Sequence, residues 1–182
     1  DGGVEYLQRA KLTAGDGAEY DYFGNSVSID GDTMVIGAWK DDDDGSNSGS
    51  AYVFTRDTAG DLASTWTQLA KLTAGDGAAD DNFGWSVSID GDTMVIGAHY
   101  DDDPTNSGSA YVYTRDTAGD LTSNWTQVAK LTAGDGADSD NFGWSVSIDG
   151  DTMVIGANGD NDPVEGSNSG SAYVFTRDTA GD

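Results

Sequence analysis

Residues 83–98 read FGWSVSIDGDTMVIGA, in which two short apolar segments flank a DGD turn. An Asp-Gly pair between apolar runs is a strong signal for a β-hairpin, because glycine accepts the positive φ that tight hairpin turns require. The stretch recurs at residues 142–157, and at residues 23–38 with Asn25 in place of the tryptophan. Three copies of one hairpin predict a repeat protein.

The remaining landmarks recur at the same interval. AKLTAGDGA starts at positions 10, 70 and 129, and GSAYV starts at positions 49, 108 and 170. These landmarks divide the chain into one repeat domain with units 1–60, 61–119 and 120–182. Each unit offers four strand candidates: an aromatic-led segment such as WTQLAKLT, the two arms of the hairpin, and GSAYVFT. Because no window has helical periodicity, we expect an all-β fold.

Four antiparallel strands in about sixty residues are typical of one blade of a β-propeller. The sequence also resembles the FG-GAP repeats of integrin-α-like propellers, in their bacterial form. The motif letters are Phe-Gly at positions 23, 83 and 142, with Gly-Ala at positions 37, 97 and 156. The resemblance covers the whole chain and implies that the FG strand is innermost and the aromatic-led strand outermost.

This arrangement leaves the two ends of the array incomplete. The strand expected at residues 5–13 has no blade of its own, and the last blade (142–177) lacks an outer strand. Three blades cannot close a ring, since propellers need about four to eight. We therefore predict a homodimer with six blades, in which each first strand completes the partner's last blade. A homotrimer with nine blades and a piece of a longer array are the alternatives.

The composition excludes several classes of partner. The net charge is −25, with 33 acidic and 8 basic residues, so we expect binding neither to nucleic acids nor to anionic membranes. No apolar run is long enough to span a bilayer, and the chain has no cysteine. The sequence shows no signal peptide, but a trimmed secreted chain would look the same. We expect an extracellular or cell-surface location, as the resemblance implies.

Aspartate accounts for almost all of the acidic residues and gathers in the loop before each GSAYV segment. Carboxylates two residues apart can ligate a hard cation, so calcium is the candidate cofactor. Its candidate ligands are Asp41, Asp43, Asp101, Asp103, Asp160 and Asp162. A face that attracts a cationic partner and a merely solvated loop are the alternatives. The calcium loop of integrin-like propellers is not carried over, because the FG hairpin turn has shrunk to DGD.

Two further sets of residues have structural interpretations. Each FG motif is preceded by an aspartate that we expect to bind the amides of its own loop; these are Asp21, Asp81 and Asp140. Trp85 and Trp144 on the innermost strands are expected to pack between blades, although repeated aromatic rings also stack on sugars.

We predict that the protein is not an enzyme. His99 is the only histidine, and it belongs to one blade alone, which excludes a repeated histidine-based site. The sequence therefore indicates a non-enzymatic, extracellular-type binding or scaffold propeller that self-assembles, with a protein or a glycan as its ligand. A carbohydrate-binding propeller, and an engineered or fragmentary repeat whose only activity is self-assembly, are the alternatives.

Overall fold

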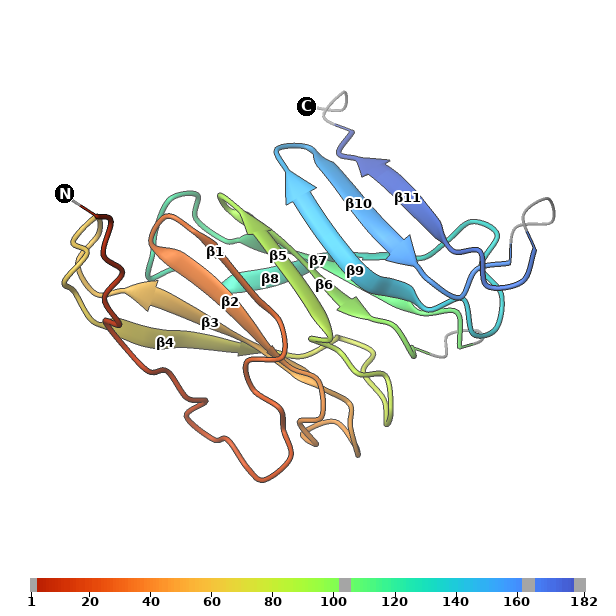
Figure 1. Ribbon diagram of the computed structural model, residues 1–182, viewed down its shortest axis with the longest axis horizontal. Coiled ribbons are helices and arrows are strands. Elements are labelled where there is room, and N and C mark those ends of the chain that lie inside the picture. Colours follow the sequence, from red (N-terminus) through yellow and green to blue (C-terminus); the bar gives the residue numbers. More distant parts are fainter. Residues whose placement is uncertain (1–2, 102–105, 162–165, 179–182) are drawn as a thin grey trace.

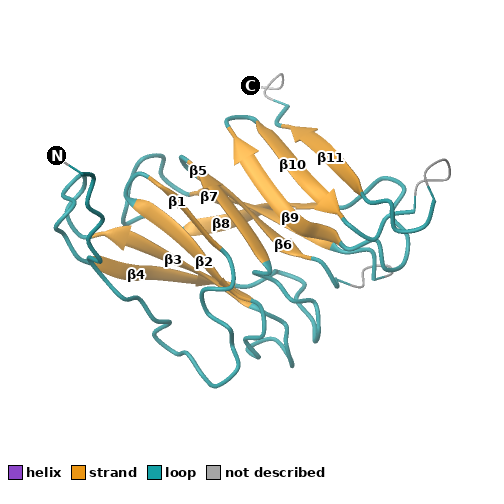
Figure 2. Cartoon of the chain, viewed as in Figure 1, coloured by secondary structure: helices purple, strands orange, loops and turns teal. Residues whose placement is uncertain are grey.

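The computed structural model describes residues 3–101, 106–161 and 166–178. Within these ranges the chain folds into antiparallel β-sheets without a helix, as the sequence predicts. Three twisted sheets stand side by side along an open arc, and the first two each take their outer strand from the repeat that follows (Figures 1 and 2). The described residues contain no helix that could cross a membrane.

Each sheet has up-and-down strand order. Blade 1 consists of β1 (Val27–Asp30), β2 (Thr33–Ala38), β3 (Ser50–Arg56) and β4 (Trp66–Leu72). Blade 2 consists of β5 (Ser86–Asp90), β6 (Thr93–Ala98), β7 (Ser109–Arg115) and β8 (Trp125–Leu131). Blade 3 consists of β9 (Phe142–Asp149), β10 (Thr152–Ala157) and β11 (Ser171–Thr176). Each blade thus combines one hairpin with the GSAYV strand, and blades 1 and 2 add the aromatic-led strand.

The two ends of the array differ from its interior. Blade 3 has three strands among the described residues, which confirms the predicted absence of an outer strand. Residues 5–13 form no strand and are exposed apart from the half-buried Leu12, so the strand expected there is absent from the described part of the single chain. The physical reason is pairing: β4 and β8, the equivalent segments, bond to β3 and β7, whereas no strand among the described residues pairs with residues 5–13.

The sequence explains the hairpins and their burial. Gly31, Gly91 and Gly150 adopt φ between 54° and 56°, the left-handed conformation that the DGD turn was expected to need. The middle strands β3 and β6 are almost entirely buried on both faces, consistent with their near-continuous apolar sequences. The main apolar clusters therefore lie between neighbouring blades.

The innermost strands β1, β5 and β9 lie next to one another along the inside of the arc. The glycine of each Gly-Ala motif permits this close approach. A Cβ atom built on Gly37 would lie 1.9 Å from the carbonyl oxygen of Gly84 in the next blade. Gly97 meets the carbonyl of Gly143 in the same way. The motif glycines thus let one blade touch the backbone of the next.

Candidate functional site

In each blade, a tyrosine of the third strand lies beside two aspartates from different loops. In blade 1, the Tyr52 hydroxyl is 2.9 Å from Asp16 Oδ1 and 2.7 Å from Asp41 Oδ2. Asp16 belongs to the loop that leads into β1, and Asp41 to the loop after β2. The two loops therefore meet at one end of the blade, because alternate connections of an up-and-down sheet emerge at the same end.

Lys71 of β4 places its ammonium group between these carboxylates. Its Nζ atom lies 2.7 Å from Asp16 Oδ2 and 3.0 Å from Asp41 Oδ2. A third carboxylate, Asp43 Oδ2, is 2.5 Å away. The lysine side chain is only 17% exposed, and Nζ also lies 5.4 Å from the centre of the Tyr52 ring. We call this arrangement the Lys–Asp–Tyr cluster.

The pKa values in the cluster follow from burial and charge. Burial disfavours the ammonium form of Lys71, but its hydrogen bonds to Asp16, Asp43 and Asp41 outweigh burial and raise the pKa above its ordinary value. Burial and the bonds to Asp41 and Asp16 raise the pKa of Tyr52. The bond from Lys71 lowers the pKa of Asp16. Lys71 and Asp16 are therefore both charged at neutral pH, and Tyr52 is a neutral hydrogen-bond donor.

Blade 2 repeats the cluster with equivalent residues. Lys130 Nζ lies 2.7 Å from Asp76 Oδ2 and 3.0 Å from Asp101 Oδ2. The Tyr111 hydroxyl is 2.9 Å from Asp76 Oδ1 and also bonds to Asp101. Partial burial opposes the ionised form of Asp76, but the hydrogen bonds from Lys130 and Tyr111 outweigh it and lower the pKa of this carboxyl. Two successive blades thus use the same charge pattern.

Blade 3 contains the acidic half of the cluster. The Tyr173 hydroxyl lies 2.9 Å from Asp135 Oδ1 and 3.0 Å from Asp160 Oδ2. A hydrogen bond from Ser171 lowers the pKa of Asp160, and that from Tyr173 lowers it further. The lysine of the other two clusters comes from the outer strand, which blade 3 lacks. Across the described ranges, no lysine or arginine forms an ion pair with Asp135 or Asp160.

The predicted calcium ligands fall into these clusters. Asp41 and Asp43 come together with Asp16, a residue that the sequence did not single out, and their carboxylate oxygens lie within 4.8 Å of one another. Asp101 and Asp160 belong to the clusters of blades 2 and 3. Asp103 and Asp162 lie outside the described residues. The ammonium group of Lys71 already lies between the three carboxylates of blade 1. These carboxylates therefore suit a lysine side chain better than Ca²⁺, which needs six or more oxygen ligands.

The aspartates before the FG motifs have the predicted structural role. The Asp21 carboxylate accepts a hydrogen bond of 2.5 Å from the amide of Ala18. Asp81 and Asp140 accept equivalent bonds, of 2.7 and 2.6 Å, from the amides three residues earlier. These side chains close the loop that delivers Asp16, Asp76 or Asp135 to its cluster.

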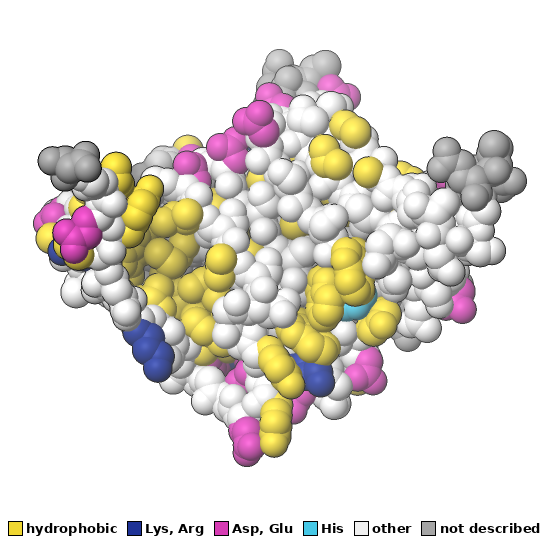
Figure 3. Space-filling view, in the orientation of Figure 1, with side chains coloured by type: hydrophobic (Ala, Val, Ile, Leu, Met, Phe, Trp, Pro, Cys, Tyr) yellow, Lys and Arg dark blue, Asp and Glu magenta, His cyan; other side chains and the backbone are white. Residues whose placement is uncertain are grey.

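A continuous row of aromatic side chains runs across all three blades. The ring centres of Trp39 and Trp85 are 5.1 Å apart, and those of Trp85 and Trp144 are 4.9 Å apart. Tyr22 stacks on Trp39 at 5.6 Å, and Lys40 lies over the Trp39 ring. All three tryptophans remain partly exposed. In Figure 3, apolar side chains gather around the histidine on this face.

His99 is buried in this row. Its ring centre lies 4.3 Å from that of Trp85 and 4.1 Å from that of Tyr100, and the residue is 1% exposed. Burial lowers the pKa of the imidazole to about 4 from its ordinary value of 6.5. Nothing in the sequence indicates this burial, because it depends on Trp85 and Trp144, which belong to two different blades.

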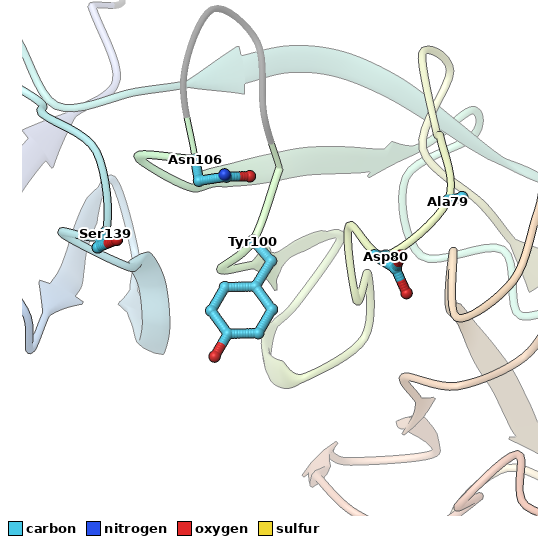
Figure 4. Close-up of a pocket in the computed structure, with 5 residues that line it drawn as sticks. All are labelled: Ala79, Asp80, Tyr100, Asn106 and Ser139. Carbon is cyan, nitrogen blue, oxygen red and sulfur yellow. The ribbon is translucent and has the colours of Figure 1, made fainter.

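A polar pocket of about 360 Å³ lies next to the aromatic row. It is lined by Ala79, Asp80, Tyr100, Asn106 and Ser139. Figure 4 shows the Tyr100 ring between Asp80 on one side and Ser139 on the other. The pocket thus combines an aromatic ring with a carboxylate, an amide and a hydroxyl group from three loops.

Comparison with known proteins identifies the repeat. The FG-GAP repeat family matches residues 6–54, 66–113 and 125–175, which together cover most of the chain. No curated protein matches the chain. The second and third matched segments each contain an aromatic-led strand, a hairpin and a GSAYV strand, and the first contains the same three sequences although its aromatic-led part forms no strand.

Proposed function

The chain belongs to the FG-GAP repeat family, and on that premise we propose that it is an extracellular-type binding or scaffold module that closes a six-bladed ring with a second copy. Propellers built from this repeat are typically non-catalytic, and the repeat in a blade fold indicates a binding or scaffold role. The two copies would exchange their N-terminal segments, each completing the partner's blade 3. A ring of three chains is the alternative stoichiometry.

The observation that carries the proposal is the exposure of equivalent valines. Val53 of blade 1 faces blade 2 and is fully buried, whereas Val174 at the same position of blade 3 is 66% exposed. On the opposite face, Val87 of blade 2 is 6% exposed and Val27 of blade 1 is 66% exposed. The two end faces of the arc therefore expose apolar residues whose equivalents are buried where two blades meet. Exposed apolar faces of this kind favour association.

Polar groups support the same closure. The hydroxyl oxygens of Ser26 and Ser28 accept hydrogen bonds from the amides of Val87 and Ile89, at 3.0 and 3.2 Å. Ser88 accepts the corresponding bond from the amide of Ile148 at 3.2 Å. Ser145 and Ser147 occupy the matching positions of blade 3 and are exposed. The hydroxyl groups of Ser145 and Ser147 would therefore accept hydrogen bonds from two amides of the inner strand of a blade docked against blade 3, as Ser26 and Ser28 do within the chain.

The experiment is size-exclusion chromatography with light scattering across a range of protein concentrations. Association into a dimer or a trimer would support the proposal and choose between six and nine blades. A folded chain that stays monomeric up to high concentration would overturn it. In a longer array the following repeat would supply the missing strand, and this chain alone would then be monomeric.

Calcium binding remains a prediction that a separate measurement tests. The acidic loops still offer exposed carboxylates, Asp42 and Asp44 among them, beside the cluster that Lys71 neutralises. Calorimetric unfolding with calcium and with EDTA should differ in melting temperature if a site exists. Identical curves would remove calcium from the proposal.

Carbohydrate binding is the second candidate function, and the aromatic row favours it. Partly exposed tryptophan rings can stack on sugar rings, and the adjacent pocket supplies hydrogen-bonding groups from Asp80 and Asn106. A glycan array with the intact protein tests this candidate, with a Trp39→Ala variant as the control. Glycan binding that is lost in the variant would support carbohydrate binding, and no binding to any glycan of the array would exclude it.

A further inference from the structure

The N-terminal segment carries a lysine at the repeat position of the two cluster lysines. Lys11, Lys71 and Lys130 are the lysines of the three AKLTAGDGA motifs. Lys71 and Lys130 each lie between two or more aspartates, but Lys11 is exposed and forms no ion pair among the described residues. In the part of the chain that the structure describes there are thus three sites of this kind, and two of them hold a lysine of the same chain.

The site without a lysine is already formed. In blade 3, Tyr173 holds Asp135 and Asp160 at 2.9 and 3.0 Å from its hydroxyl, close to the 2.9 and 2.7 Å found for Asp16 and Asp41 in blade 1. In blades 1 and 2 the equivalent pair of carboxylates binds a lysine ammonium group, so the pair in blade 3 has the geometry of a lysine site. The N-terminal segment of the same chain packs against blade 1, at the opposite end of the arc from blade 3 (Figure 1).

We infer that Lys11 of the partner subunit enters the Asp135–Asp160–Tyr173 site and completes a third Lys–Asp–Tyr cluster between the two chains. The inference rests on the proposed ring closure and specifies its register. In blade 1, β3 pairs with β4 so that Tyr52 opposes Lys71, Thr55 opposes Thr67 and Arg56 opposes Trp66. The same register sets Tyr173 opposite Lys11, Thr176 opposite Leu7 and Arg177 opposite Tyr6 of the partner subunit.

Two independent contacts agree with this register. The Gln68 side chain of β4 accepts a hydrogen bond of 2.8 Å from the amide of Gly15, and Gln127 accepts one of 2.9 Å from Gly75. Gly134, the third equivalent glycine, has open space where its glutamine would lie, and Gln8 is the residue that the register delivers there.

The second contact is between an arginine and an aromatic ring. Arg56 lies 4.4 Å from the Trp66 ring centre, and Arg115 lies 4.5 Å from that of Trp125. Arg177 has no such ring among the described residues, while Tyr6 is almost fully exposed. Lysine, glutamine and aromatic ring are therefore all present on one segment, at the spacing that blade 3 requires.

The inference is tested by the dissociation constant of the full chain, measured by sedimentation. Lys11→Met should raise it about a hundredfold, because a charged hydrogen-bonded partner is lost at both interfaces of a two-chain ring and each loss costs about tenfold. Lys130→Met is the matched control. It removes the lysine of a cluster within one chain, so it should lower the melting temperature and leave the dissociation constant within a few-fold.

A double-mutant cycle identifies the pairing partner. Asp160→Asn should weaken association on its own, and it should add little when combined with Lys11→Met. Additive effects of the two substitutions would overturn the pairing, as would a dissociation constant that Lys11→Met leaves unchanged in a chain that still associates. A wild-type chain that does not associate would instead overturn the ring closure on which the inference rests.

Discussion

The motif glycines provide a sharp test of how the blades meet. A Cβ atom on Gly37 would lie 1.9 Å from the Gly84 carbonyl oxygen, whereas an ordinary contact is about 3.4 Å, so blade 2 would have to withdraw by about 1.5 Å. Overpacking of this kind costs about 3 kcal/mol. For a chain of this size, Gly37→Ala should lower the melting temperature by roughly 6 to 12 °C.

Gly156→Ala is the matched change at the open end. The nearest atom to its new methyl group is Ser145 Oγ, at 2.5 Å, which belongs to a side chain that can rotate away. The isolated chain should therefore lose less than about 1 kcal/mol. In a closed ring, however, the methyl group would meet a backbone carbonyl of the partner, and the dissociation constant should rise at least about a hundredfold.

Thermal unfolding by circular dichroism and sedimentation measure the two effects separately. Comparing Ser145→Ala with Ser145→Ala/Gly156→Ala isolates the effect of the methyl group, because both variants lack the Ser145 hydroxyl. If Gly37→Ala unfolds at the wild-type temperature, the contact between blades 1 and 2 is not as described. If Gly156→Ala associates as tightly as the wild type, the open face of blade 3 is not the interface.

Three further predictions concern the single chain. His99→Asn should remove a pH dependence: because the buried imidazole stays neutral down to a pKa of about 4, protonation favours the unfolded chain, and wild-type stability should fall by on the order of 2 kcal/mol relative to the variant between pH 6.5 and 4. If urea unfolding gives the same dependence of stability on pH for the wild type and for His99→Asn, the burial of His99 is refuted. Asp81→Ala should cost about 1 to 2 kcal/mol in the same assay, since the Ala78 amide loses its acceptor. Gly91→Ala should cost about 1 kcal/mol, because φ is 55° there, and an unchanged midpoint would contradict the turn.

Local patterns in the sequence were sufficient for most of the fold. The DGD turns, the strand order within each blade and the missing outer strand of blade 3 follow from short-range signals repeated three times. The roles of Asp21 and its equivalents were also predictable, because each bonds an amide three residues away.

The cluster was not predictable in the same way. Asp16 and Lys71 are 55 residues apart, and only the packing of two loops over one outer strand brings them together. A repeated lysine at the outer strand, in step with a repeated aspartate and tyrosine, was the available signal. Residues 5–13 have the sequence of a strand but form none in the single chain. A strand needs a second strand to pair with, and the local sequence does not indicate which strand that is.

The most direct test of strand exchange between two copies is a disulfide at the inferred register. The chain has no cysteine, so Leu7→Cys and Thr176→Cys introduce one unambiguous pair, with Leu7→Cys and Val174→Cys as the control two residues out of register. Oxidation of the first pair should yield a covalent dimer of about 38 kDa, twice the 18.9 kDa of one chain, and the control should yield far less. A cross-link that forms within a single chain, or none at all, would contradict ring closure by a second copy.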